Sequence, residues 1–178
     1  MKRILFYLLF TSISNFAQLS NMGVGINTGI GEIKGNSSSV TSFGVSVYFD
    51  FNLWFTENVS FRTGYSYFRK IEYFIPEERM GRYYPFIKLF YLKSILQQEI
   101  PEYFFVEEGI GIIYLNDRTL SDTNNWQYGI AFNLATGLDL AKMKKSNLKL
   151  SIGLDYGYGL NKTNASYYLF YLSTKLIL

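Results

Sequence analysis

Few residues of this 178-residue chain could do chemistry, because it contains no histidine and no cysteine. It therefore lacks the commonest general base and metal ligand, as well as thiolate nucleophiles, thiolate metal sites and disulfide bonds. Acidic pairs remain at residues 77–78 and 107–108, and paired carboxylates can do acid–base work. Glu107 and Glu108 lie in an alternating segment, where neighbouring side chains point to opposite faces and cannot reach one substrate. The pair at 77–78 lies in a polar connection, so the sequence predicts no catalytic residue, no metal site and no enzyme.

Cofactor and nucleic-acid binding are equally poorly supported. The glycine pairs Gly23-x-Gly25 and Gly29-x-Gly31 lack the strand–turn–helix context of a dinucleotide site, so we expect no cofactor. The formal net charge is +3, from 17 basic and 14 acidic residues. Without Lys2 and Arg3, which lie in a segment interpreted below as removed, 15 basic residues face 14 acidic ones. No basic stripe appears, which argues against nucleic-acid binding.

The elements that must carry any function are strands, because the dominant hydrophobic period after residue 21 is two. The clearest segment, 43–53, places apolar side chains at every second position for eleven residues. Aromatic residues make up 19% of the chain, which favours sheet over helix. We predict eight strands in these alternating segments: 22–33, 43–53, 59–69, 83–93, 103–115, 126–140, 148–160 and 166–178. Polar connections separate them, including 94–102 and 116–125, which predicts one antiparallel up-and-down β-barrel.

The two faces of the predicted strands indicate which solvent each one meets. The polar faces hold mainly glycine, serine, alanine and asparagine, which suits the crowded lumen of a narrow barrel. The apolar faces are long and edged by aromatic residues, as in a lipid-facing wall: Tyr67, Trp126, Tyr158 and Tyr168. A soluble, lipocalin-like barrel is the alternative, but its polar face should be rich in charge. The pattern favours a transmembrane barrel in contact with outer-membrane lipid.

Sparse charges on the polar faces form the candidate site. A charge inside a narrow lumen is costly unless it is paired, and equal numbers of acids and bases allow pairing. We predict an interior ion-pair network that plugs or constricts the lumen, formed by Asp50, Arg62, Lys88, Glu107, Asp139, Lys149, Asp155 and Lys175. The alternative for residues near strand ends, Lys149 and Lys175 especially, is that they reach water. Glu108 falls in an apolar row, which a bulge or a position near the membrane interface would explain.

The first segment has the plan of a secretory signal peptide. Lys2 and Arg3 precede the apolar run 4–10, and Ala17 follows a more polar stretch as the residue at the cut. The run is too short to span a bilayer as a helix. We therefore predict two parts, a signal peptide at 1–17 and a barrel domain at 18–178, and export through the inner membrane to the outer membrane.

Two segments carry a resemblance to a known family. Tyr84-Pro-Phe-Ile-Lys-Leu-Phe-Tyr-Leu-Lys93, followed by Tyr103-Phe-Phe-Val-Glu-Glu-Gly-Ile-Gly-Ile-Ile-Tyr114, resembles the small outer-membrane β-barrel proteins of Bacteroidota-type bacteria. The end of the chain, Leu172–Leu178, looks like the signal read by the barrel-assembly machinery, although such signals usually end in Phe.

The resemblance implies an outer-membrane location and a barrel fold. Barrel enzymes of this kind, such as lipid A deacylases and outer-membrane proteases, rely on a catalytic histidine that this chain lacks. The expected function is a non-enzymatic structural or interaction role in the envelope, with an unidentified envelope protein as a partner. The alternative is a small pore or transporter for small or apolar compounds.

Overall fold

The computed structural model of the protein describes residues 20–52, 58–75, 77, 82–100, 103–143, 146–160 and 163–178. The predicted signal peptide at 1–17 lies outside these residues. No helix among the described residues is long and apolar enough to cross a membrane.

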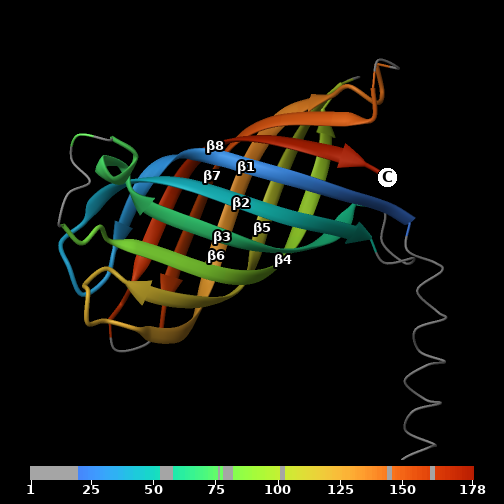
Figure 1. Ribbon diagram of the computed structural model, residues 1–178. Coiled ribbons are helices and arrows are strands. Elements are labelled where there is room, and N and C mark those ends of the chain that lie inside the picture. Colours follow the sequence, from blue (N-terminus) through green and yellow to red (C-terminus); the bar gives the residue numbers. More distant parts are fainter. Residues whose placement is uncertain are drawn as a thin grey trace, which may run out of the picture.

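Eight strands make up almost the whole of the described chain (Figure 1). Their bounds are β1 Ser20–Lys34, β2 Val40–Asn52, β3 Val59–Lys70, β4 Phe86–Ile100, β5 Phe104–Arg118, β6 Asn125–Asp139, β7 Leu148–Gly159 and β8 Ser166–Ile177. A short 3-10 helix, η2 Ile71–Phe74, follows β3.

The strands form a closed barrel in which each one pairs antiparallel with its neighbours in the sequence, and β1 pairs with β8. This confirms the predicted eight-stranded antiparallel up-and-down barrel. Closure gives every strand two partners, so the barrel has no open sheet edge. We call the end where β1 begins and β8 finishes the terminal end. The opposite end, where η2 lies, is the loop end (Figure 1).

The predicted strand bounds are wrong in one substantial place. Residues 94–102 were expected to form a connection, but β4 continues to Ile100 and pairs there with Phe104 of β5. The sequence pattern ends early because both faces become polar at the terminal end, where Gln97 and Gln98 follow each other. β5 similarly runs to Arg118, three residues beyond its predicted end.

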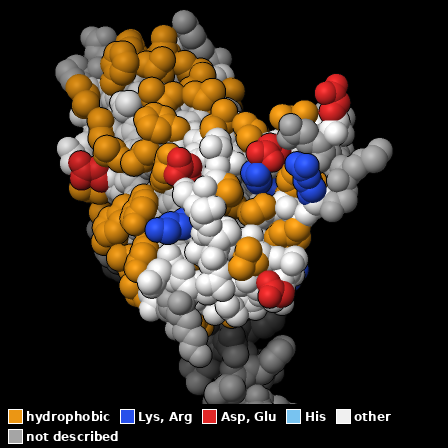
Figure 2. Space-filling view, turned by 90° about the vertical axis from the view of Figure 1, so that its left-hand side faces the viewer, with side chains coloured by type: hydrophobic (Ala, Val, Ile, Leu, Met, Phe, Trp, Pro, Cys, Tyr) orange, Lys and Arg blue, Asp and Glu red, His pale blue; other side chains and the backbone are white. Residues whose placement is uncertain are grey.

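The outer wall of the barrel is apolar and exposed. Ile26, Ile112, Phe170 and Leu172 are 50–66% exposed, and every strand contributes further large apolar side chains to this wall. Viewed from the loop end, hydrophobic side chains gather on the barrel wall, and charged ones are few and scattered (Figure 2). A contiguous apolar surface of this extent is rare on water-soluble monomers.

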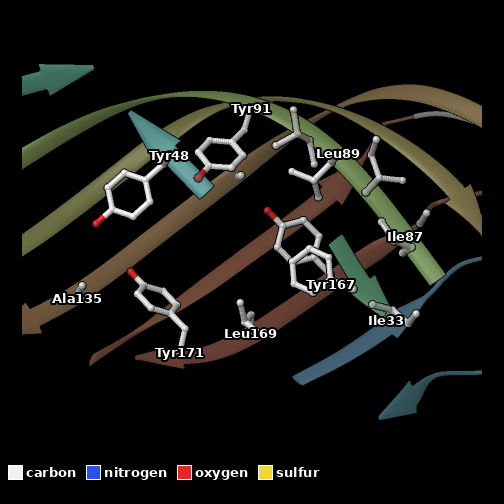
Figure 3. Close-up of a cluster of buried hydrophobic side chains, with 14 residues drawn as sticks. Ile33, Tyr48, Ile87, Leu89, Tyr91, Ala135, Tyr167, Leu169 and Tyr171 are labelled. Atoms are coloured by element: carbon white, nitrogen blue, oxygen red, sulfur yellow. The ribbon is translucent and has the colours of Figure 1, made fainter. Parts of the chain in front are cut away.

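The inside of the barrel is filled by side chains, and its loop-end half is apolar. Side chains that are at most 1% exposed meet there from five strands: Ile33, Phe68, Ile87, Leu89, Ile113, Leu115, Tyr167 and Leu169. Figure 3 shows Tyr48, Tyr91 and Tyr171 towards one end of this cluster and Ile33 and Ile87 at the other. We call the eight side chains the apolar plug. The sequence analysis expected small and charged residues inside the barrel and did not predict this plug.

Candidate functional site

Glycines on the inner wall make room for the side chains that fill the barrel. An added Cβ atom at Gly25 would overlap the ring of Tyr48, and one at Gly157 would overlap the ring of Tyr167. The same relationship joins Gly64 to Tyr91 and Gly153 to Tyr171. Interior glycines and tyrosines therefore interlock, because each glycine leaves room for a tyrosine ring that reaches it from another strand.

Arg62 is the centre of the largest group of interior charges. Its Nε and Nη2 atoms donate to the two carboxylate oxygens of Asp50 at 2.7 and 2.8 Å. Nη2 also donates to Oε2 of Glu107 at 2.9 Å. The guanidinium carbon lies 4.3 Å from the centroid of the Tyr48 ring. Arg62 is only 3% exposed, so its charge is compensated by two carboxylates rather than by water.

Lys175 extends this group to β8. Its Nζ atom donates to Oδ2 of Asp50 at 2.6 Å, across the intervening strand β1. The stem of Lys175 passes Gly23, where an added Cβ atom would lie 2.7 Å from Cε. The glycine on β1 therefore allows side chains from β2 and β8, which are not neighbouring strands, to form an ion pair.

A second ion pair crosses the barrel between β4 and β7. Nζ of Lys93 donates to both carboxylate oxygens of Asp155 at 2.7 Å, and Lys93 is only 2% exposed. The hydroxyl of Tyr167 lies 3.5 Å from Oδ1 of the same carboxylate. This pair connects the charged groups to the apolar plug, to which Tyr167 belongs.

A third pair lies at the terminal end and is more accessible to solvent. Lys149 and Asp139 face each other on β7 and β6, with 3.1 Å between Nζ and Oδ2. Nζ also donates to Oε1 of Gln97 at 3.0 Å. These three side chains line a polar cavity of about 240 Å³ that also contacts Lys175.

Of the eight predicted interior charges, Asp50, Arg62, Glu107, Asp139, Lys149, Asp155 and Lys175 point inward, and each lies in one of these ion pairs. The prediction for Lys88 is wrong. Lys88 lies in the outer row of β4 between Phe86 and Phe90, and its Nζ atom is 5.5 Å from the centroid of the Trp126 ring. The inner row is Ile87, Leu89, Tyr91 and Lys93.

The error at Lys88 has a physical cause. Both rows of β4 are apolar, because its inner row contributes to the apolar plug, so composition could not tell the two faces apart. The signal that could have identified Lys93 was the balance of charge, because Asp155 needs a cation inside the barrel. With Lys93 in place of Lys88, four acidic and four basic side chains still face one another.

Glu108 points outward, opposite to Glu107, and is exposed. The registers of β5 with β4 and with β6 continue through Glu108 without a shift, so no bulge is present. Its neighbours across the strands are Leu96 and Leu134. The explanation by a bulge is therefore wrong, and a position near the membrane interface stays a prediction for Glu108, which lies four residues from the start of β5.

Asp117 is a buried carboxylate that the sequence analysis placed in a connection. It is 0% exposed and accepts hydrogen bonds at its Oδ1 atom from the backbone N–H and the hydroxyl of Thr119, at 2.9 and 2.8 Å. Its Oδ2 atom accepts from the backbone N–H of Asn36 at 3.3 Å. Asp117 therefore joins the β1–β2 connection to the start of the β5–β6 connection at the loop end.

The arrangement of these side chains is better suited to blocking the lumen than to catalysis. The described residues contain no group of three or more acidic side chains that could hold a metal ion. The buried carboxylates are engaged by cations or by backbone N–H groups, and the apolar plug separates those that pair with cations from the loop end.

Solved structures that superpose on this chain include small bacterial outer-membrane barrels. Neisserial surface protein A (NspA) superposes with a TM-score of 0.61 at 10% identity, over 88% of this chain and 97% of that one. Ail, the attachment invasion locus protein of Yersinia pestis, solved with the heparin analogue sucrose octasulfate, gives 0.55 at 10% identity, over 89% and 98%. The outer membrane enzyme PagL gives 0.52 at 13% identity, over 86% and 99%.

The sequence itself gives no closer relationship. No protein-family model matches it, and a search of curated proteins finds no match. The resemblance to the Bacteroidota-type family therefore stays a prediction. What the comparisons establish is the fold, a complete eight-stranded barrel of the kind found in small bacterial outer-membrane proteins.

Proposed function

We propose that this protein is an integral barrel of a bacterial outer membrane that does not conduct solutes and has a structural or interaction role in the envelope. The observation that carries the proposal is the combination of a filled interior with an apolar, exposed outer wall. A soluble barrel would reverse the two surfaces, and a pore would keep the interior open.

The outer wall supports the membrane location. On β3 to β6, aromatic side chains form a row across the strands near the loop end: Tyr65, Phe90, Tyr114 and Tyr128. Towards the terminal end the next row is aliphatic, with Leu92, Ile112 and Ile130. An aromatic row beside an aliphatic band is the arrangement that lipid-facing barrel walls have at a membrane interface.

The filled interior supports the structural role over the pore. The apolar plug holds side chains that are at most 1% exposed, and the rings of Phe68 and Tyr167 lie with centroids 4.6 Å apart across the barrel. Reconstitution into planar bilayers tests this directly. We expect no channel events, whereas reproducible openings would favour the alternative of a small pore or transporter.

The absence of an enzymatic activity is part of the proposal. The fold does not decide it, because the outer membrane enzyme PagL shares the architecture. What supports it is the chain itself, which has no histidine or cysteine and whose interior carboxylates are paired.

Export and assembly complete the proposal. We infer that residues 1–17 act as a signal peptide and that β8 is recognised by the barrel-assembly machinery. Expression of the full chain in a Gram-negative host, followed by membrane fractionation, should give a shortened protein in the outer membrane. Its unboiled form should migrate differently from the boiled form on SDS gels. A soluble protein whose migration boiling does not change would overturn the membrane location.

A further inference from the structure

Three neighbouring cations on the outer wall of β3–β5 have no acidic partner among the described residues. Arg69 on β3, Lys88 on β4 and Arg118 on β5 all lie in outer rows at the loop end. Among the described residues, no carboxylate lies within ion-pair distance of any of them. The interior cations, in contrast, are all paired. We call these three residues the basic patch.

The register brings the basic patch together. Phe86 is the cross-strand partner of both Arg69 and Arg118, and both guanidinium carbons lie 5.6 Å from the centroid of its ring. Cross-strand spacing places the Cα atoms of the two arginines about 10 Å apart. Lys88 follows Phe86 by two residues, or about 7 Å along β4.

Aromatic rings hold the cations of the basic patch in place. The guanidinium of Arg69 lies 3.4 Å from the centroid of the Tyr73 ring, and its Nη1 atom donates to the hydroxyl of Tyr67 at 3.1 Å. Lys88 lies beside Trp126. Arg118 makes no side-chain hydrogen bond within the described chain; its Nε atom is buried, which leaves the two terminal amino groups of the guanidinium to bind an anion.

The rows of the outer wall fix the depth of the basic patch. The aromatic row formed by Tyr65, Phe90, Tyr114 and Tyr128 is followed towards the loop end by the row that holds Lys88 and Trp126. The next row holds Arg69, Phe86 and Arg118. Cations directly beyond an aromatic row lie at the level of lipid headgroups.

The geometry points to a binding site for the phosphate of an anionic lipid headgroup, formed by Arg69, Lys88 and Arg118 on the outer wall of β3–β5. This inference rests on the proposed membrane location. Unpaired cations complement a phosphate, and arginine can bind phosphate oxygens with two parallel N–H donors. The adjacent aromatic and aliphatic rows would contact the acyl chains of the same lipid, which commits the site to a lipid rather than to free phosphate.

The test uses the fluorescence of Trp126, which lies beside Lys88, as the reporter. The chain has two tryptophans, so Trp54→Phe leaves Trp126 as the only one. This protein is reconstituted in vesicles that contain phosphatidylcholine and increasing fractions of phosphatidylglycerol, with one of the two lipids brominated on its acyl chains. Quenching of the Trp126 fluorescence by the brominated lipid then reports the affinity of the adjacent site for phosphatidylglycerol relative to phosphatidylcholine.

We expect phosphatidylglycerol to be favoured about fivefold or more, because a cation near a charged lipid surface contributes about that factor. The double variant Arg69→Gln, Arg118→Gln should bring the ratio of the two lipid affinities close to one. Lys88→Gln alone should reduce this ratio. Raised salt should weaken the preference. The matched control is Lys34→Gln, an exposed cation near the loop-end terminus of β1, which should leave the preference unchanged.

Each outcome is distinct. If the protein inserts into vesicles but Trp126 shows no preference for phosphatidylglycerol, or if Lys34→Gln lowers the preference as much as Lys88→Gln, the lipid site is wrong and the membrane location stands. If the protein does not insert at all, the proposed function itself fails. If the double variant does not fold, Lys88→Gln and Arg118→Gln tested singly decide the question.

Discussion

Arg62 on β3 faces Asp50 on β2 in register and donates two hydrogen bonds of 2.7 and 2.8 Å to its carboxylate inside the barrel. Asp50 is fully buried and receives Lys175 from β8 as well, while Arg62 reaches Glu107 on β5. One cross-strand pair thus connects four strands. Because the charges are buried, removing one member should lower the free energy of unfolding far more than breaking a surface ion pair does.

Arg62→Met should therefore destabilise the barrel by about 3 kcal/mol, since it leaves Glu107 buried without a cation. Urea unfolding of the protein folded in a zwitterionic detergent measures the change. The matched control is Lys142→Gln, which breaks the exposed pair with Glu99 and should cost less than about 1 kcal/mol. Equal effects of the two substitutions would contradict the central role of Arg62. The double variant Asp50→Asn, Arg62→Met should be less destabilised than the sum of the single variants.

The inner and outer rows of β4 give a second prediction. Lys93→Met should cost about 3 kcal/mol, because Asp155 then loses its only cation among the described residues. Lys88→Met, five residues earlier in the outer row, should change stability by less than about 0.5 kcal/mol in zwitterionic detergent. The same unfolding assay compares the two. A larger loss for Lys88→Met would mean that the register of β4 is shifted by one residue.

The contrast between Lys88 and Lys93 shows what the sequence could and could not predict. Period-two alternation identified eight strands, and the glycine-rich rows identified the inner face on β1 and β7. On β4 both rows are apolar, and the choice between them depends on what fills the barrel opposite, which is a property of the closed structure. The apolar plug was missed for the same reason, since Ile33, Phe68 and Leu169 come from strands far apart in the sequence. Asp117 was missed because its N–H donors lie in two separate connections.

Interlocking of glycine and tyrosine gives a third prediction. Gly25→Ala should destabilise the barrel by about 1–3 kcal/mol, because the added methyl group overlaps the ring of Tyr48. Tyr48→Leu removes the ring and should rescue part of this loss in the double variant. Unfolding of the two single variants and the double variant forms a thermodynamic cycle. Strictly additive effects would show that Gly25 and Tyr48 do not interact.

Asp117 gives the fourth prediction, which concerns the loop end rather than the stability of the whole barrel. Its carboxylate accepts three hydrogen bonds that join the β1–β2 connection to Thr119. Asp117→Ala removes the acceptors and leaves the two backbone N–H groups without their partner, at a local cost of about 1–3 kcal/mol. Hydrogen exchange at the backbone amides of Asn36 and Thr119 should accelerate by one to two orders of magnitude, while exchange in the central part of β5 should not change.

Asp122→Asn, at an exposed position in the β5–β6 connection, is the matched control and should leave both amides protected as before. Unchanged exchange at Asn36 in Asp117→Ala would show that the β1–β2 connection is held by other contacts.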